Sequence, residues 1–358
     1  NRDKPFFCWS SWIAPHPPWN PPEPFASMYN NEDMPLPVHG DRDVETLPPR
    51  HRGMTNFCDM GNAPDERLQR VKALYGASIS HIDKGVGRIL RALDELGLAE
   101  NTLVVFTSDH GELLGDHQMW QKGVPFEASV NVPLLARLPG KFEAGAVNED
   151  LVSLLDLMPT MLDVADVDYP SEKGLAGDSL VGRTGGGLTE ARDDYVVEIG
   201  RGASRWLSLR GHKWKYNYWL ADGWAELYDL EVDPEETHNL LLGNVEDTHR
   251  QQADTMHKRL TGWESENGFT DSLDAAGQLV NLNQPPVDAT EMRTNGQFPR
   301  WVARLPDEER ALMESRGETV VNAIQNEDTF KLEETNLKAF GEAGGSLEGT
   351  VYQHLTDG

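Results

Sequence analysis

The chain has 358 residues, which is enough to bury a sizeable core in one large domain accompanied by a smaller one. Its formal net charge of -27 argues against nucleic-acid binding, because a binder needs a basic face to neutralise phosphates. The acidity instead predicts a solvated surface rich in Asp and Glu. Two cysteines cannot build a disulfide framework, and no apolar stretch reaches the roughly 18 residues that a membrane span requires.

The start of the sequence leaves the compartment open. No signal peptide is visible, and the chain begins with NRDKP rather than with methionine. We therefore expect that the natural N-terminus is missing from these residues. The cytoplasm is slightly preferred to secretion as the location.

The first segment of the chain combines aromatic residues with proline. Residues 5–12, PFFCWSSW, are expected to form a short aromatic strand with Cys8 in the core. The APHPPWNPPEPF stretch that follows forbids regular structure and fixes a stiff path, which holds His16 in place. A lone histidine is by default a surface or structural residue. The irregular stretch continues to about Pro64, a length typical of functional or mobile loops.

A long helix is expected next. Apolar residues recur at helical spacing after Asp65, and the pattern continues as far as Leu96. Asp65 is a plausible N-cap, and Gly97 is the expected C-terminal stop. The helix leads directly into an apolar strand, which is the helix-to-strand half of a βαβ unit.

Residues 101–129, NTLVVFTSDHGELLGDHQMWQKGVPFEAS, are the centre of the sequence. The apolar run from Thr102 to Thr107 predicts a buried parallel strand, and polar residues follow it at once. Ligands of open α/β sheets bind beyond the carboxyl ends of the strands, so Asp109 and His110 stand where a metal or a substrate would be held. Gly111 lets the backbone turn sharply at this point.

Several further elements are expected downstream. VNVPLLARLPG predicts a strand, and SLLDLMPTMLDVADV predicts a short amphipathic helix with Pro159 in its first turn. The glycine-rich GLAGDSLVGRTGGG marks a boundary near Gly187. An antiparallel sheet of about four strands is then predicted by YVVEI, RWLSLRG, KWKYNYW and AELYDLE. A helix is expected around residues 253–263, and the polar end beyond Gly268 is expected to wrap around the protein or to be partly disordered.

Several motifs, in the right order, resemble the sulfatase branch of the alkaline-phosphatase superfamily, a branch that includes phosphonate and phosphate ester hydrolases. The similarity extends from Phe6 to about Leu242. Its motifs are APHPPW, YGASISHIDKGVGRIL, SDHGELLGDH, WQKGVPFEASVNVPLL, GHKWKYNYW and AELYDLEVDPEETHNL. A lone DHG would be a weak signal, whereas this ordered set is specific.

The resemblance implies an α/β fold of the alkaline-phosphatase type. Its main part would be a mostly parallel, doubly wound sheet with helices on both faces, lacking its N-terminal strands. A small C-terminal α+β subdomain would carry the antiparallel sheet of about four strands. The expected domains are a remainder of the catalytic domain at 1–187, the antiparallel subdomain at 188–268 and a polar extension at 269–358.

The resemblance also implies a metal-dependent site. Asp109 and His110 would be two ligands of one divalent cation, with calcium as the first choice and magnesium, manganese or zinc as alternatives. Lys122 would hold the sulfate or phosphate oxygens as a compact cationic clamp. His16 would donate to the substrate anion or to its leaving oxygen.

Other residues of the same segment are expected to support this site. His117 could point into the pocket or brace the loop behind the ligands, and Glu112 is a further candidate for such a supporting role. Trp120 and Phe126 are expected to pack the loop, and Glu127 is expected to be structural.

One family feature is absent from the sequence. Family members carry, early in the chain, a pair of aspartates for the same metal and a Cys or Ser followed by xPxR, whose first residue becomes formylglycine. Only fifteen residues precede His16, and Cys8 and Cys58 lack the required Pro and Arg. Residues 46–50, TLPPR, have that spacing with threonine in front. They follow the HPP loop, and we interpret them as a chance match in a proline-rich linker.

We therefore expect the C-terminal portion of a sulfatase-like enzyme, inactive alone, with formylglycine confined to the missing upstream part. Its substrate would be a small sulfate ester, with phosphonate or phosphate esters as the alternative. The missing N-terminal half, or an oligomer partner, would be needed to cover exposed apolar edges. The competing class of function is a non-catalytic remnant or interaction subunit.

Overall fold

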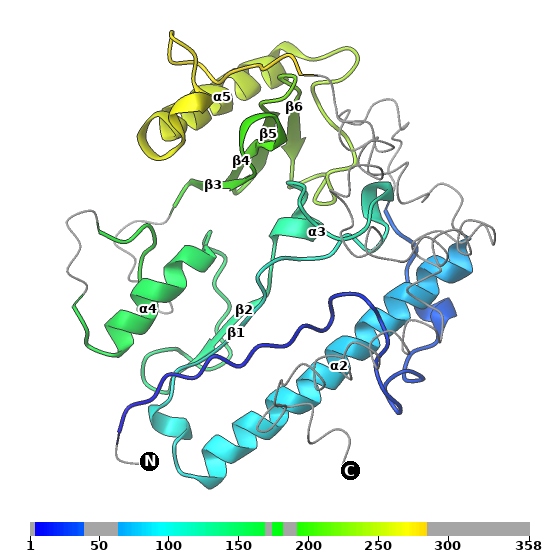
Figure 1. Ribbon diagram of the computed structural model, residues 1–358, viewed down its shortest axis with the longest axis vertical. Helices are drawn as coiled ribbons and strands as arrows, with labels where there is room; N and C mark the ends of the chain where they lie inside the picture. Colours follow the sequence, from blue (N-terminus) through cyan, green and yellow to red (C-terminus); the bar gives the residue numbers. More distant parts are fainter. Residues whose placement is uncertain (1–3, 39–63, 169–173, 182–191, 285–358) are drawn as a thin grey trace, which may run out of the picture. The chain divides into compact units, whose positions relative to one another are not determined.

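The computed structural model describes residues 4–38, 64–168, 174–181 and 192–284 (Figure 1). Several sequence predictions lie outside the described residues. These are Cys58, the TLPPR stretch at 46–50, the boundary at Gly187 and all but the first part of the expected 269–358 extension.

The described residues form two compact units. The first comprises residues 4–35 and 69–84, and the second comprises 36–38, 64–68, 85–168, 174–181 and 192–284. Helix α2 (Asp65–Glu95) contributes its middle to the first unit.

The first unit packs the N-terminal segment against the middle of α2. The hydroxyls of Tyr29 and Ser80 lie 2.7 Å apart and share a hydrogen bond. The ring of Phe25 lies 4.9 Å from that of His81, and the ammonium of Lys84 lies over the same phenyl ring. A short 3-10 turn, η1 (Asn31–Asp33), ends the segment. The irregular proline-rich segment is therefore held by side-chain contacts to one helix.

The prediction of an aromatic strand at residues 5–12 is wrong. This segment has no regular secondary structure, and Cys8, expected in the core, is exposed. Phe7 and Trp9 are also exposed, at 72% and 74%. No strand among the described residues pairs with this segment, so its apolar side chains have no sheet on which to pack.

Helix α2 confirms the long helix predicted after Pro64. It begins at Asp65, but the N-cap is Pro64 rather than the predicted Asp65. Gly97 has a φ of 67°, and the N–H of Leu98 donates to the carbonyl of Leu93 over 2.8 Å. This is the glycine-terminated helix end that the sequence predicted.

The second unit contains the strand that carries the candidate site. Strand β1 (Val104–Thr107) pairs antiparallel with β2 (Leu134–Arg137). The expectation of a buried strand with parallel neighbours is wrong for the described residues, because β2 is its only partner among them and Phe106 is exposed. The segment that joins the two strands, residues 108–133, is called the joining segment below. It folds the chain back beside β1, and that reversal makes the pairing antiparallel.

Helix α4 (Leu157–Val164) follows β2 and has Pro159 in its first turn, as predicted. The turn before it, η6 (Leu154–Asp156), is capped by the hydroxyl of Ser153. The remaining short elements are η4 (Ala99–Asn101), η5 (Asp116–Gln118), α3 (Glu127–Val130), η7 (Gly202–Ser204) and η8 (Thr270–Ser272).

An antiparallel sheet of four strands confirms the second predicted sheet. Its order is β3-β4-β5-β6, with every neighbouring pair antiparallel. The strands are β3 (Asp194–Ile199), β4 (Trp206–Gly211), β5 (Trp214–Trp219) and β6 (Ala225–Asp229). Helix α5 (Asp247–Asn267) includes the helix expected around residues 253–263 and extends beyond it at both ends.

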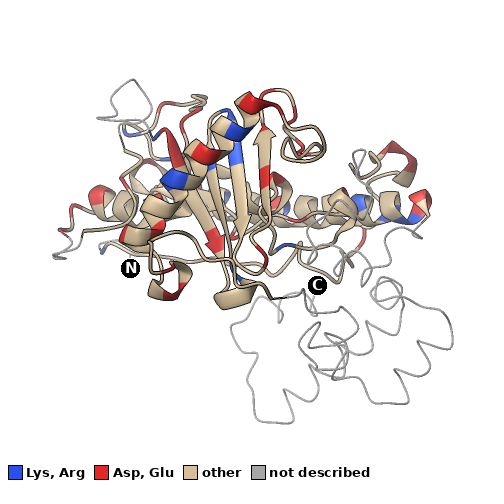
Figure 2. Ribbon diagram, turned by 90° about the horizontal axis from the view of Figure 1, so that it is seen from above, with Lys and Arg blue, Asp and Glu red and all other residues tan. Residues whose placement is uncertain are grey.

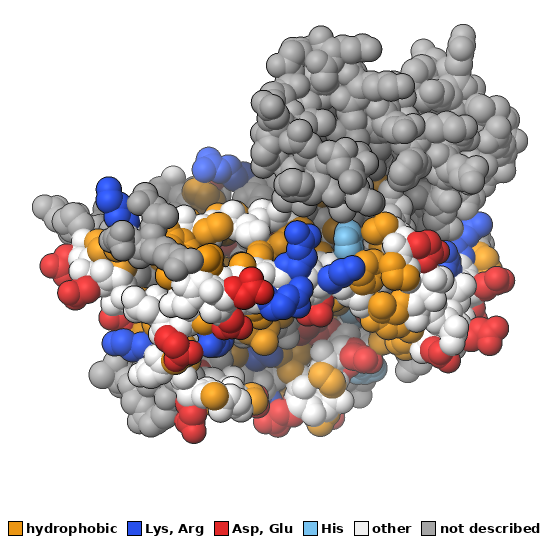
Figure 3. Space-filling model, turned by 90° about the horizontal axis from the view of Figure 1, so that it is seen from below, with side chains coloured by type: hydrophobic (Ala, Val, Ile, Leu, Met, Phe, Trp, Pro, Cys, Tyr) orange, Lys and Arg blue, Asp and Glu red, His pale blue; other side chains and the backbone are white. Residues whose placement is uncertain are grey.

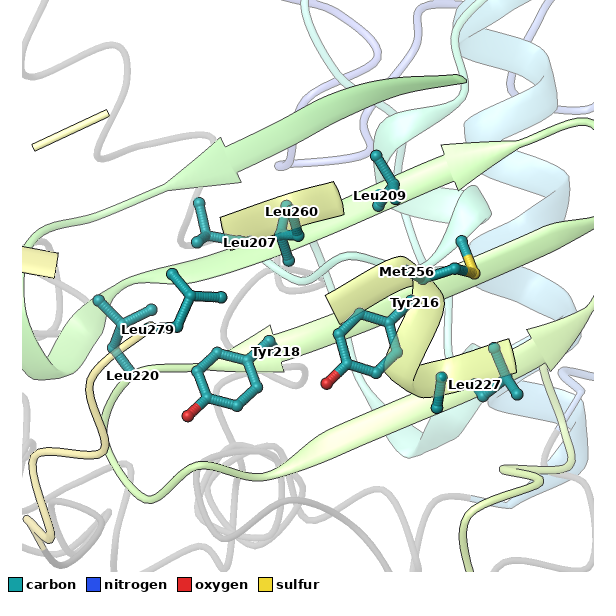
Figure 4. Packing of buried hydrophobic residues seen from close by; sticks show 10 residues of the cluster. Leu207, Leu209, Tyr216, Tyr218, Leu220, Leu227, Met256, Leu260 and Leu279 are labelled. Carbon is teal, nitrogen blue, oxygen red and sulfur yellow. The ribbon is translucent and has the colours of Figure 1, made fainter. Parts of the chain in front are cut away.

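One face of this sheet forms an apolar core with α5 (Figure 4). Successive side chains of a strand point to opposite faces, so alternate residues of β4, β5 and β6 reach this core. Met256 and Leu260 of α5 pack between them. The strand residues are Leu207, Leu209, Tyr216, Tyr218 and Leu227.

The opposite face of the sheet is buried as well, beneath the joining segment. Tyr228 of β6 and Leu230 after it pack with four apolar residues of that segment, which are Leu113, Met119, Val124 and Phe126. The sheet therefore lies between α5 and the joining segment, and it connects the C-terminal helix to the candidate site.

The charges are distributed over many elements rather than gathered in one (Figure 2). Apolar side chains are also exposed between charged ones on the face shown in Figure 3, and Leu135 of β2 is among the exposed apolar residues of the chain. Within the part of the chain that the structure describes, no helix is both long enough and apolar enough to cross a membrane.

The core beneath α5 gives a test of the packing. Leu260 is fully buried in that core. We expect Leu260→Ala to lower the free energy of unfolding by about 2–5 kcal/mol, because it removes buried methyl groups and leaves a cavity. Urea unfolding followed by circular dichroism measures this change. Leu242→Ala is the matched control, since Leu242 is exposed, and an equal loss in both variants would contradict the packing described here.

Candidate functional site

Asp109 and His110 lie directly after β1, at the start of the joining segment. The carboxylate of Asp109 is 85% exposed, and its Oδ1 accepts the backbone N–H of His110 over 3.0 Å. Its Oδ2 lies 3.6 Å from Nε2 of His110. The structure therefore brings the two predicted ligand atoms together at an accessible position.

The tautomer of His110 favours a cation at this pair. Nδ1 of His110 lies 2.9 Å from the carbonyl oxygen of Gly111, which can only accept, so Nδ1 carries the hydrogen. A ring with a single proton then presents the lone pair of Nε2 beside the Asp109 carboxylate. The Nε2 lone pair and the negative carboxylate oxygen repel each other unless a proton or a cation lies between them. Both atoms are suitable metal ligands.

These two residues fit a metal only in part. A divalent cation takes at least four ligands, whereas the pair supplies one carboxylate oxygen and one imidazole nitrogen. Among the described residues, no group of three or more His, Cys, Asp or Glu side chains is arranged to hold a metal ion. The donor chemistry is therefore right, but the described residues do not complete a coordination shell.

Glu112 follows the Asp-His pair in the sequence and contacts the backbone beside Lys122. Its Oε1 accepts the backbone N–H of Gln121, the residue before Lys122, and that of Leu114. Burial raises the pKa of Glu112, against the opposing hydrogen bonds from the Gln121 and Leu114 N–H groups and the positive charge of Lys122. Glu112 braces the backbone that carries Lys122.

The remaining supporting residues are buried. His117 is only 3% exposed, and its ring stacks on Phe126 at 3.9 Å between centroids. Its backbone N–H donates to the carbonyl of Val38 over 2.8 Å. The sequence left open whether His117 points into the pocket or braces the loop, and this packing agrees with bracing. Trp120 and Phe126 are buried, as expected for residues that pack the segment.

Gly111 allows a close approach within the joining segment. Its N–H donates to the carbonyl of Ser129 over 2.8 Å, and a Cβ at this position would lie 2.1 Å from the carbonyl oxygen of Ala128. Only glycine fits there without movement of the backbone. The predicted role of Gly111 in a sharp turn is thus a packing requirement as well.

Glu127 is the centre of a buried ion-pair cluster that sequence reasoning did not find. Its Oε1 accepts from the ammonium of Lys215 over 2.8 Å, and its Oε2 accepts from Arg210 over 3.2 Å. Lys215 is fully buried and lies 2.8 Å from a carboxylate oxygen of Glu236, which is also buried. The other carboxylate oxygen of Glu236 accepts the backbone N–H of Glu127.

The two glutamates of this cluster titrate differently. Burial alone would raise the pKa of Glu127, but Lys215 and Arg210 outweigh burial and lower it. Burial raises the pKa of Glu236 to about 7, opposed by Lys215 and by the hydrogen bond from the Glu127 N–H, while the charge of the Glu127 carboxylate adds to the shift. A small pocket of about 100 Å³ borders the cluster and is lined by Glu127, Glu236, His117 and Asp116, among others.

His16 belongs to the first unit, whereas the residues above belong to the second. Its ring is exposed, and Nδ1 lies 2.8 Å from the carbonyl oxygen of Pro17, so Nδ1 carries a hydrogen. The peptide bonds Ala14-Pro15 and Pro17-Pro18 on either side are cis. That the proline-rich segment holds His16 in place for a role in the site stays a prediction.

Two family models match the chain. One, described as Sulfatase, matches residues 1–167, and the other, described as N-sulphoglucosamine sulphohydrolase, C-terminal, matches residues 115–266. An arylsulfatase of Clostridium perfringens is 36% identical over 286 residues, covering 75% of this chain and 56% of that protein. A choline-sulfatase of Rhizobium meliloti is 31% identical over 242 residues, covering 66% of this chain and 46% of that protein.

A solved structure is also similar. The phosphonate monoester hydrolase of Silicibacter pomeroyi superposes with a TM-score of 0.63 at 28% identity, covering 71% of this chain and 54% of that one. This similarity confirms the expected alkaline-phosphatase type of fold. The chain spans about half the length of the curated relatives it matches.

The matches define the class first: the chain is a member of the alkaline-phosphatase superfamily. Within it, the chain belongs to the sulfatase-like proteins, as the ordered motifs predicted. Sulfatases generally use a divalent cation, which agrees with the donor chemistry of Asp109 and His110.

The contact at Gly111 makes a first prediction for this site. Gly111→Ala should lower the free energy of unfolding by about 1–3 kcal/mol, because the new Cβ overpacks against the Ala128 carbonyl. Gly262→Ala in α5 is the matched control, since nothing lies within 4 Å of its Cβ position. The control should instead be stabilised by roughly 0.5–1 kcal/mol. Urea unfolding of both variants checks this, and an equal response would refute the close approach.

The pKa of Glu236 makes a second prediction. The folded chain holds this proton up to a pH of about 7, whereas an unfolded glutamate loses it near the ordinary value of 4.5. The stability that Glu236 contributes is therefore fully present below pH 4.5 and is lost as the pH rises from 4.5 to about 7. Thermal unfolding from pH 4.5 to pH 8 should show a loss that Glu236→Gln removes. Glu235→Gln, at the exposed neighbouring position, should keep the wild-type profile, and identical profiles for all three proteins would contradict the shift.

Proposed function

We propose that this chain carries the metal-holding and substrate-holding part of a hydrolase of sulfate esters. The observation that supports the proposal is the Asp109–His110 donor pair directly after β1, with Lys122 on the same braced segment. Because the chain spans about half of its curated relatives, activity, substrate and partners are proposed for the whole enzyme. The substrate would be a small sulfate ester.

In this proposal Asp109 and His110 hold one divalent cation, and calcium is the first choice. A carboxylate oxygen suits calcium or magnesium, whereas the imidazole also accommodates manganese or zinc. Bound there, the cation would polarise the ester oxygens and activate the nucleophile. Asp109 supplies the negative charge, and the Nδ1–H bond to the Gly111 carbonyl keeps Nε2 of His110 oriented as a donor atom.

Lys122 would hold the anionic oxygens of the substrate. An ammonium is a compact charge with three donors, and it stabilises negative charge that develops in the transition state. The hydrogen bond from the Gln121 N–H to Glu112 fixes the backbone from which this side chain extends.

The proposed roles of His16 and of the nucleophile depend on the family resemblance alone. His16 would donate a proton to the leaving oxygen of the ester. The 358 residues contain no Cys or Ser followed by xPxR. We propose that the formylglycine nucleophile and the pair of metal-binding aspartates are supplied from outside these residues.

A phosphonate or phosphate ester is the alternative substrate. The observation that favours it is the similarity to a phosphonate monoester hydrolase, and a second hydrolase of that description, from Agrobacterium radiobacter, has a TM-score of 0.62. Both ester types present a tetrahedral anion that one lysine can hold. The ratio of kcat/KM for an aryl sulfate and for the matching phenylphosphonate ester decides between them, and a ratio below one would favour the alternative.

Asp109 and Lys122 should fail in different ways in the longer protein that includes the nucleophile motif. Asp109→Ala should remove metal and activity together, because it removes a ligand. Lys122→Ala should keep its metal and lose kcat by roughly a hundred- to thousandfold, since it removes one charge-assisted contact that strengthens in the transition state. Metal analysis by mass spectrometry and steady-state kinetics measure both effects.

The matched control is Lys141→Ala, because Lys141 is an exposed lysine beyond β2 and should behave like the wild type. The assignment of the joining segment would be wrong if Lys122→Ala were metal-free or fully active. Undetectable hydrolysis of either ester type by the longer wild-type protein would instead favour the non-catalytic alternative.

A further inference from the structure

The joining segment has a strained backbone around Lys122. Four residues that are not glycine have positive φ values: Leu114 at 47°, His117 at 53°, Gln118 at 60° and Gln121 at 69°. Residues with a Cβ rarely adopt positive φ values. Such a backbone conformation persists only where the surrounding structure determines it. Something outside the segment must therefore hold it in place.

Strand β4 provides the first of these external contacts. The indole Nε1–H of Trp206 donates to the carbonyl oxygen of Gly123 over 2.9 Å. Trp206 is only 2% exposed, so no water competes for this bond. Gly123 is the residue directly after Lys122, with a φ of 93°. The bond therefore fixes the chain one residue from the proposed substrate ligand.

Strand β5 provides the second contact, four residues further along the segment. The ammonium of Lys215 binds the carboxylate of Glu127 over 2.8 Å, while Glu236 accepts the backbone N–H of Glu127. Arg210 of β4 also donates to this carboxylate, over 3.2 Å. Both the side chain and the backbone of Glu127 are thus held by the C-terminal sheet and the turn that follows it.

These contacts come from a single face of the sheet. Trp206, Arg210 and Lys215 lie on the face opposite to Leu207, Leu209 and Tyr216, which Figure 4 shows packed beside α5. A fully buried lysine is poor support for stability as such, because removing its charge from water offsets most of the attraction to its partners. Its geometry, by contrast, is sharply defined by two carboxylates.

We propose that Trp206 and Lys215 are positioning residues that hold Lys122 in its working geometry. The proposal rests on the proposed role of Lys122 and deepens it. The C-terminal sheet clamps the joining segment at Gly123 and at Glu127. Lys122 is thereby presented by a backbone that cannot relax toward ordinary φ values. Neither residue touches substrate, and both act through Lys122.

Hydrogen exchange tests the clamp without reference to activity and uses the 358-residue chain itself. Trp206→Phe keeps the aromatic ring and removes the donor to Gly123. The amides of Leu113 and Gly115 donate to the carbonyl oxygens of Gln121 and Met119 within the segment. We expect hydrogen exchange of these two amides to accelerate by about tenfold. Trp214→Phe is the matched control, because Trp214 packs on the α5 face, and it should leave these amides unchanged. Equal exchange in the two variants would overturn the proposal.

Kinetics in the longer protein test the link to Lys122. Trp206→Phe should lower kcat by about ten- to hundredfold with little change in KM, because misplacement weakens a contact made in the transition state. Lys215→Met should act in the same way, and Trp206→Phe keeps the test valid if that variant does not fold. In a Lys122→Ala background, Trp206→Phe should have no further effect.

The outcomes separate this inference from the proposed function. If Trp206→Phe lowers kcat equally with and without Lys122, it does not act through Lys122 and the positioning role is refuted. If Lys122→Ala is fully active, the proposed function fails, while hydrogen exchange still decides whether the sheet clamps the segment.

Discussion

The buried ammonium of Lys215 is the constraint on which the second unit depends. It is fully excluded from water and lies between the carboxylates of Glu127 and Glu236, at 2.8 Å from each. Removing this ammonium would take the shared counter-charge from both buried carboxylates, and an uncompensated buried charge destabilises a protein by about 3–5 kcal/mol. Strand β5, helix α3 and the turn after β6 must therefore stay together. The joining segment is fixed at its far end by this requirement.

The four-stranded sheet performs two tasks because both of its faces are buried. One face is apolar and packs against Met256 and Leu260 of α5. The other presents Trp206, Arg210 and Lys215 to the joining segment, together with Tyr228, which extends the apolar contact. Strand alternation separates the stabilising residues from the positioning residues on the same strands. The C-terminal sheet is thus part of the support of the candidate site.

The solvent exposure of the site residues differs with the roles proposed for them. Asp109 is open to solvent and can receive a ligand, whereas Glu112 and His117 are mostly buried and hold the backbone. Glu112 braces the middle of the segment, since it accepts the backbone N–H of Gln121, the residue before Lys122. The strain at Gln121 and its neighbours is tolerated because these buried contacts determine the backbone.

The sequence by itself determined the elements whose pattern is local. Helix α2 with its stop at Gly97, helix α4 with Pro159 in its first turn and the four antiparallel strands all follow from periodicity and turn residues. The ordered motifs also identified the family and placed Asp109 and His110 side by side after a strand, because adjacency in sequence guarantees proximity.

Only the tertiary structure decided the rest. The antiparallel partner of β1, the exposure of Cys8 and the roles of Trp206, Lys215 and Glu236 depend on contacts between distant residues. Lys215 and Glu127 are separated by 88 positions, and Glu236 and Glu127 by 109. In KWKYNYW the polar residues Lys215 and Asn217 share one strand face, and that face is buried here. The alternation of apolar and polar residues predicts which residues share a strand face. Whether water or another segment covers that face depends on contacts that form only when distant parts of the chain fold together.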